Sequence, residues 1–128
     1  MKIEVSIGEV LDKLSILEIK TKMVDDLQKK VNITKEYEYL KEAVISELSI
    51  DPSSLPDYEK LYAVNSRLWQ IEDRLRVKEK TQEFDEDFIT HARLVYINND
   101  ERAKIKKEIN VKYNSNFTEE KSYKHLTQ

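Results

Sequence analysis

Hydrophobic side chains recur along the chain in steps of three and four residues, which is the period of an α-helix. The first such stretch begins after Ser6, which can cap a helix, and Glu9 follows at the spacing of a capping box. One seam then continues through Val10, Leu14, Leu17, Thr21, Val24, Gln28 and Val31. A second apolar row lies on another flank, at Ile16, Met23 and Leu27. The pattern predicts one long helix ending at Asn32, packed between neighbours or placed at a subunit interface.

Two further helices follow on either side of a proline-bounded loop. A single stripe predicts a helix from about Thr34 to Leu48, with Tyr37, Leu40, Val44 and Leu48 on one face. Pro52 and Pro56 then interrupt the helical pattern, so residues 51–56 are predicted to be a loop. The next helix is predicted from about Pro56 to Lys80, and its seam is the most regular in the chain: Leu61, Val64, Leu68, Ile71 and Leu75.

The fourth helix is predicted to begin at Asp85, a good capping residue, with Phe84 and Ile89 at the positions of a hydrophobic staple. Its apolar stripe includes Phe88, Ala92, Val95, Ile109 and Tyr113. Two alternatives stay open, because the helix either runs unbroken to residue 113 or kinks near residues 98–100. The polar stretch 114–116 ends it, and residues 118–128 are expected to form a short helix or an arm.

These elements predict an all-α fold: an antiparallel bundle of about four helices in a single domain spanning residues 1–128, with residues 113–128 as a peripheral tail. Composition agrees, since 37% of the residues are charged and the chain has one Gly and two Pro, far fewer turn residues than a β-sandwich or barrel needs. The two-flanked first helix and the regular third seam favour a homodimer.

Composition also limits the cellular compartment and the partners that we expect for the protein. The chain has no cysteine, so it can form neither disulfides nor zinc–thiolate sites, and a reducing cytoplasm is expected. No apolar run approaches the roughly 20 residues of a membrane span, and we see no signal peptide. The net charge is −3, with acidic and basic residues well mixed, which disfavours a nucleic-acid partner.

Candidate chemistry lies where polar residues fall on or beside apolar helix faces. Counting 100° per residue places Asn99, Arg102 and Lys106 within the apolar arc of the fourth helix. One interpretation is a polar pocket between helices. Its candidate ligand-binding residues are Lys13, Lys20, Trp69, Arg76, Asn99, Arg102 and Lys106. Its candidate catalytic or Mg²⁺-binding carboxylates are Glu9, Asp12, Glu72 and Asp73.

The competing interpretation is structural. In a chain this rich in charge, some charged side chains fall near the core by chance and form ion pairs there. We weigh this interpretation about two to one over the pocket, because charges near a core mark sites only statistically. His91, at the edge of the fourth helix's apolar arc, is expected to be a packing residue, since the sequence shows no orienting partner for a catalytic base.

Four motifs together resemble a known family. They are Ser6-x-Gly8-Glu9-x-x-Asp12-Lys13-x-x-Ile16-Leu17-x-Ile19-Lys20, Asn65-x-x-Leu68-Trp69-x-x-Glu72-Asp73-x-x-Arg76, Ala92-Arg93-x-Val95-Tyr96-x-x-Asn99-Asp100-x-Arg102-Ala103-x-Ile105-Lys106-x-x-Ile109-Asn110, and Glu119-Glu120-Lys121-Ser122-Tyr123. The chain is similar, from about residue 3 to 123, to a family of short helical bacterial and phage proteins, a domain of unknown function. The resemblance implies a cytoplasmic protein of a bacterium or phage-infected cell and carries no established activity.

The sequence therefore predicts a small cytoplasmic helical protein whose role is that of a dimeric interaction or regulatory module, with itself as partner. The alternative is a Mg²⁺-dependent enzyme or binding protein for a phosphorylated ligand, such as a nucleotide or sugar nucleotide. Whether the protein is an enzyme is left open.

Overall fold

A computed structural model describes residues 1–115 of the chain. These residues form four α-helices and no strand, which confirms the all-α prediction. The helices are α1 (Ile7–Met23), α2 (Leu27–Leu48), α3 (Pro56–Thr81) and α4 (Glu86–Lys112), and a short 3-10 helix, η1 (Pro52–Ser54), lies between α2 and α3. The arm expected at residues 118–128 lies outside the described residues.

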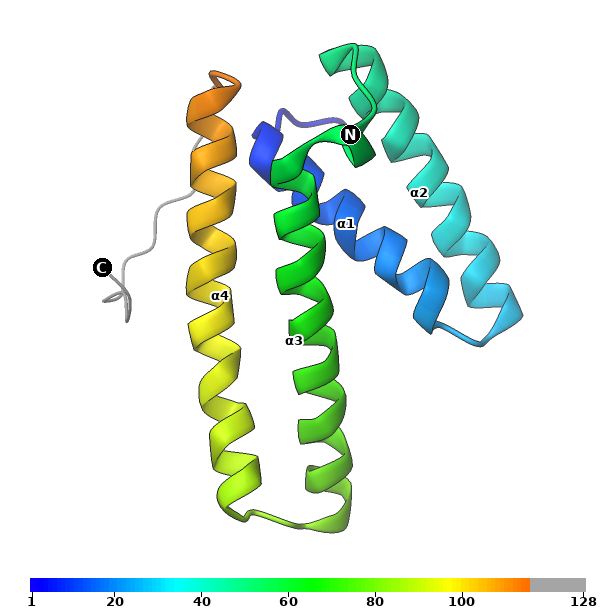
Figure 1. Cartoon of the computed structure of the whole chain (residues 1–128). Coiled ribbons are helices and arrows are strands. Elements are labelled where there is room, and N and C mark those ends of the chain that lie inside the picture. Colours follow the sequence, from blue (N-terminus) through cyan, green and yellow to red (C-terminus); the bar gives the residue numbers. More distant parts are fainter. Residues whose placement is uncertain (116–128) are drawn as a thin grey trace.

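The helices are arranged as two hairpins of unequal length. Helices α3 and α4 lie side by side over their full length, and α1 crosses one half of this long hairpin obliquely (Figure 1). Helix α2 packs mainly on α1, on the side away from α4 (Figure 1). The far half of the α3–α4 hairpin therefore extends beyond the α1–α2 pair.

The predicted first helix is wrong in its length. Helix α1 ends at Met23, and α2 begins at Leu27 rather than at Thr34. Asp26 caps α2, since its carboxylate accepts a hydrogen bond of 2.9 Å from the backbone N–H of Lys29. The apolar seam continues across this turn, but local capping ends the helix and lets α2 fold back on α1.

The other helix boundaries agree with the sequence. Asp85 caps α4 by accepting the backbone N–H of Phe88 at 2.9 Å, and α4 then continues without a break through residues 98–100. Phe84 does pack onto the first turn of α4, but the ring it contacts is that of Phe88, at 5.2 Å between centroids, rather than the expected Ile89. The expected loop at residues 51–56 contains η1, and Asp51 caps it.

The hydrophobic core lies at the end of the molecule where all the helices meet. Its buried side chains come from every helix: Leu11, Leu14, Val44, Leu55, Tyr58, Leu61, Val64, Ile105 and Ile109. Helix α2 contributes only Val44 to this buried set. Most of the surface of α2 is therefore exposed, while α1 is buried on a wide arc.

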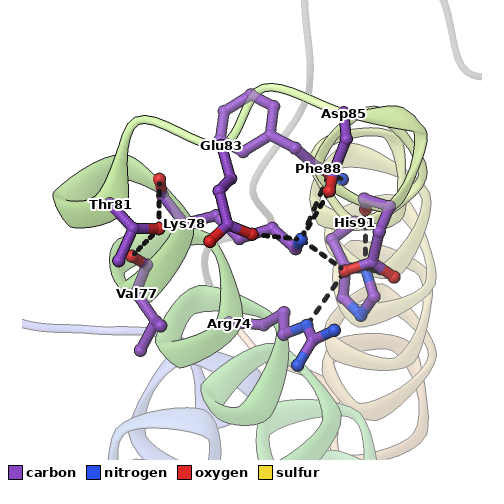
Figure 2. Close-up of polar contacts among 9 residues, drawn as sticks. Arg74, Val77, Lys78, Thr81, Glu83, Asp85, Phe88 and His91 are labelled. Atoms are coloured by element: carbon purple, nitrogen blue, oxygen red, sulfur yellow. Dashed lines mark hydrogen bonds and ion pairs between the residues drawn. The ribbon is translucent and has the colours of Figure 1, made fainter.

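An ion-pair network closes the opposite end of the long hairpin (Figure 2). The nearly buried ammonium of Lys78 lies 2.9 Å from Asp85 and 3.4 Å from Asp87, and Arg74 donates to Asp87 at 2.9 Å. The hydrogen bond from Lys78 lowers the pKa of Asp85, and the one from Arg74 lowers the pKa of Asp87. His91 completes the network, since its Nδ1 lies 2.8 Å from the backbone oxygen of Asp87 and 3.4 Å from the carboxylate of the same residue.

Candidate functional site

A buried carboxylate at the centre of α1 connects three helices. Asp12 is 1% exposed, and both of its oxygens accept from Arg102 of α4, at 2.8 Å from Nε and 2.5 Å from Nη2. Asn65 of α3 donates from Nδ2 to the same carboxylate at 2.9 Å and to the Ser15 hydroxyl at 2.8 Å. Because a buried charge is costly without partners, this set of bonds is what allows Asp12 to lie in the interior.

The first turn of α1 is held by side chains rather than open to a ligand. The backbone N–H of Gly8 donates to Asn110 at 2.7 Å, and those of Ile7 and Glu9 donate to the hydroxyls of Ser115 and Ser6. These three amides would otherwise be free at a helix N-terminus. The Ser6-x-Gly8-Glu9 motif therefore docks α1 onto the end of α4.

A cleft of about 440 Å³ lies beside the Asp12–Arg102 pair, between α1, α3 and α4. Its lining combines apolar and aromatic side chains with polar and charged ones: Ile16, Ile19, Asn65, Leu68, Trp69, Glu72, Asp73, Arg76 and Arg102. The carboxylate side chains of Glu72 and Asp73 are exposed at the rim. This cleft is the candidate binding site.

The fold brings together five of the residues that the sequence marked as candidates. Trp69, Glu72, Asp73, Arg76 and Arg102 all line the cleft. A sixth, Asn99, lies next to it, with its side-chain oxygen 3.5 Å from Arg102. Spacing along α3 explains most of this group, since these positions share one side of a single helix.

The remaining candidates lie elsewhere. Lys106 is buried and pairs with Glu9 at 2.8 Å, and Lys13 pairs with Glu36 of α2 at 3.3 Å. Lys20 is half-buried in the last turn of α1 and does not line the cleft. These contacts agree with the structural interpretation for Glu9, Lys13 and Lys106.

Some residues of this region were not among the sequence candidates. Asn65 is 5% exposed, and its position directly after Val64 in the α3 seam is the sequence signal that could have identified it. The Tyr58 hydroxyl donates to Glu18 at 2.8 Å, and burial together with this bond raises the pKa of Tyr58. Neither this bond nor the one from Asn65 to Asp12 could be predicted from helical spacing, because the partners are far apart in sequence.

Residues 1–115 contain neither a cluster of metal-binding side chains nor a helix that could span a membrane. No group of three or more His, Cys, Asp or Glu side chains is placed to hold a metal ion there. The paired carboxylates expected to bind Mg²⁺ are separated, since Asp12 is buried against Arg102 and Glu72 and Asp73 lie on the cleft rim. None of the described helices is both long and apolar enough to cross a membrane.

The fold and the cleft define a small all-helical protein with a mostly apolar cleft beside a buried carboxylate–arginine pair. The chain belongs to the Family of unknown function (DUF6165), whose model matches residues 1–127. This confirms the expected membership of a family of unknown function, while a bacterial or phage origin stays a prediction. No curated protein and no solved structure matches the chain.

Proposed function

We propose that the protein is a homodimeric interaction module that works without catalysis, in the cytoplasm of a bacterial or phage-infected cell. The observation that carries the non-catalytic part of the proposal is the burial of Asp12 and its bonding to Arg102. A general base must reach the proton that it removes, but Asp12 is buried and both of its oxygens are bonded to Arg102. Asp12 therefore acts as a structural anchor for α1 and α4.

The cleft itself favours contact with another macromolecule over chemistry. Its lining includes Ile16, Leu68 and Trp69, and aromatic side chains with apolar neighbours are typical of the buried centre of protein interfaces. The exposed side chains of Glu72, Asp73 and Arg76 supply polar groups along the α3 side of the cleft. An apolar centre with a polar rim is the usual organisation of a protein–protein contact.

A second candidate function is the binding of a phosphorylated ligand. Arg76 and Arg102 line the same cleft as Trp69, which could stack on a nucleotide base while a guanidinium contacts a phosphate. Against this, Arg102 is already bonded to Asp12, and Glu72 and Asp73 would repel an anion. The first proposal is therefore the stronger.

Trp69 provides a direct test, because it is the only tryptophan in the chain and it lines the cleft. Molar mass would be measured by light scattering from micromolar to hundreds of micromolar, together with Trp69 emission over the same range. We expect the mass to approach that of a dimer and the emission to shift as the protein concentration rises. A monomer at every concentration would overturn the proposal.

The second candidate is tested on the same protein. Nucleotides and sugar nucleotides would be added with and without Mg²⁺, and the thermal midpoint and Trp69 emission would be recorded. A ligand that binds the folded state raises the midpoint. A shift in both signals for one nucleotide, in a protein that stays monomeric, would replace the dimer proposal with the ligand-binding one.

A further inference from the structure

A second cleft lies at the end of the molecule where α4 ends, and we call it the terminal cleft. It has a volume of about 510 Å³ and lies between the start of α1, the end of α2 and the end of α4. Most of its lining is apolar, and includes Val5, Ile7, Val10, Val44, Leu48 and Tyr113. Because Val5 is 44% exposed, an apolar side chain placed in the terminal cleft would remove apolar surface from water.

The last described residue, Ser115, is itself part of the lining of the terminal cleft. Its backbone N–H donates to the carbonyl oxygen of Asn110 at 2.8 Å, and its hydroxyl accepts the N–H of Ile7 at 3.0 Å. Asn114 has a φ of 52°, and its N–H donates to the carbonyl oxygen of Val111 at 3.3 Å. The two backbone bonds form a Schellman motif, which ends α4 and fixes the point from which the chain continues.

The next large apolar residue along the chain is Phe117, two positions after Ser115. Two residues span at most about 7 Å, so the Cα atom of Phe117 is within that distance of a residue that lines the terminal cleft. This limit follows from covalent geometry and holds for every conformation of the segment. An aromatic side chain buries about 150–250 Å² of surface when it is enclosed, so the burial of Phe117 would be strongly favoured.

We propose that Phe117 occupies the terminal cleft of its own chain and thereby ties residues 116–128 to the ends of α1, α2 and α4. Tethering selects this occupant, because a side chain on a short linker acts at an effective concentration in the millimolar range. Charge does not select it, since Glu4 and Glu47 line the cleft and residues 116–128 carry both signs. The contact lies within one chain, so it does not depend on the homodimer proposed above.

The family match also includes this segment. The family model extends to residue 127, so residues 116–127 belong to the sequence that the family model describes. A segment that only ended the chain would need no place in that sequence, whereas one that completes the fold would. The match therefore agrees with a structural role for Phe117.

The environment of residue 117 can be followed with a single tryptophan. The reporter protein carries Trp69→Phe, which removes the only native tryptophan, together with Phe117→Trp. A binding pocket covers about 70–90% of the surface of its occupant, so acrylamide should quench the reporter at least about threefold less in the folded protein than in urea. The emission maximum of the folded protein should also lie at a shorter wavelength.

The lining of the terminal cleft is tested by Val5→Asp in the reporter protein, with Ile3→Asp as the matched control. Both residues are exposed apolar side chains before α1, at 44% and 76%, but only Val5 lines the cleft. Because both are exposed, we expect the fold to persist, and circular dichroism would check it. Val5→Asp should restore most of the quenching, since a carboxylate in the cleft opposes the burial of an aromatic ring, and Ile3→Asp should leave it unchanged.

Cross-linking distinguishes the segment of the same chain from that of a second copy. The chain has no cysteine, so Glu47→Cys with Thr118→Cys provides the only pair of thiols. Glu47 lines the terminal cleft, and a disulfide forms only where two Cα atoms approach within about 7 Å. The control is Val111→Cys with Thr118→Cys, because Val111 belongs to the last turn of α4 and does not line the cleft. We expect an intramolecular disulfide that forms several-fold faster in the first pair than in the control.

Three results would contradict this docking. The first is a reporter at residue 117 that acrylamide quenches as strongly in the folded protein as in urea. The second is a reporter that Val5→Asp and Ile3→Asp affect equally. The third is a disulfide that forms no faster than in the control, or that links two copies, since the occupant is then the segment of another chain.

Discussion

Replacing Asp12 by asparagine would measure how much the buried carboxylate contributes to the fold. The side chain keeps its size but loses its charge, and one of its two oxygens becomes an amide nitrogen facing the guanidinium of Arg102. Removing one partner of a buried ion pair costs about 3–5 kcal/mol. The side chain of Arg102 is 28% exposed, so water can compensate part of this loss, and we expect about 3 kcal/mol.

The loss would be measured by urea unfolding, followed through Trp69 emission and circular dichroism. In a domain of this size a loss of 3 kcal/mol corresponds to a decrease of about 10 °C in Tm. The dependence of the unfolding free energy on urea should not change, since the fold stays the same. Asp73→Asn is the matched control, because Asp73 is an exposed carboxylate of the same cleft, and its effect should stay within about 0.5 kcal/mol.

A double-mutant cycle with Arg102→Met would then isolate the interaction between the two charges. We expect a coupling of about 1–3 kcal/mol, because the residues are in direct contact. If Asp12→Asn is as stable as the wild type, or if the two substitutions are additive, Asp12 is not a structural anchor. The non-catalytic interpretation would then lose its main support.

Two further predictions concern the ends of the long hairpin. Gly8→Ala should lower stability by about 1–3 kcal/mol in urea unfolding, because its Cβ would lie 2.5 Å from the carbonyl oxygen of Lys106 and 2.8 Å from Oδ1 of Asn110; greater stability, as helix propensity alone predicts, would refute this close approach of α1 and α4. Lys78→Met should remove a contribution that acts at neutral pH and disappears in acid. The bond from Lys78 lowers the pKa of Asp85 below its ordinary 3.8, so the stability difference between wild type and variant should be constant near pH 7 and shrink as pH falls below about 3.8. A difference that is the same at pH 7 and pH 2.5 would contradict this assignment.

Much of the local structure could be predicted from the sequence. The regular seam of Leu61, Val64, Leu68 and Ile71 predicted α3 almost to the residue, and Asp85 was identified as the cap of α4. Such signals are local: a cap bonds an amide two or three residues away, and a stripe depends only on the helical period. The grouping of Trp69, Glu72, Asp73 and Arg76 in one cleft is also local, because all four belong to α3.

The predicted boundary between the first two helices, at Asn32, is wrong for a physical reason. The apolar period continues from Val24 to Val31, but a period does not say whether the chain between its members stays helical. Asp26 can cap a new helix, and the packing of Val44 against the core stabilises the turn that makes this possible. The choice between one long helix and a hairpin therefore depended on contacts made twenty residues later in the chain.

The sequence by itself determined that the protein is helical, where most helices begin and end, and which polar residues lie near apolar faces. Only the tertiary structure decided the partners of those residues. It joined Asp12 to Arg102, 90 positions away. It also placed Gly8 so close to α4 that a Cβ does not fit there, although glycine ordinarily weakens a helix. The reason is that helical periodicity defines the faces of each helix, while the angles at which helices cross decide which faces meet.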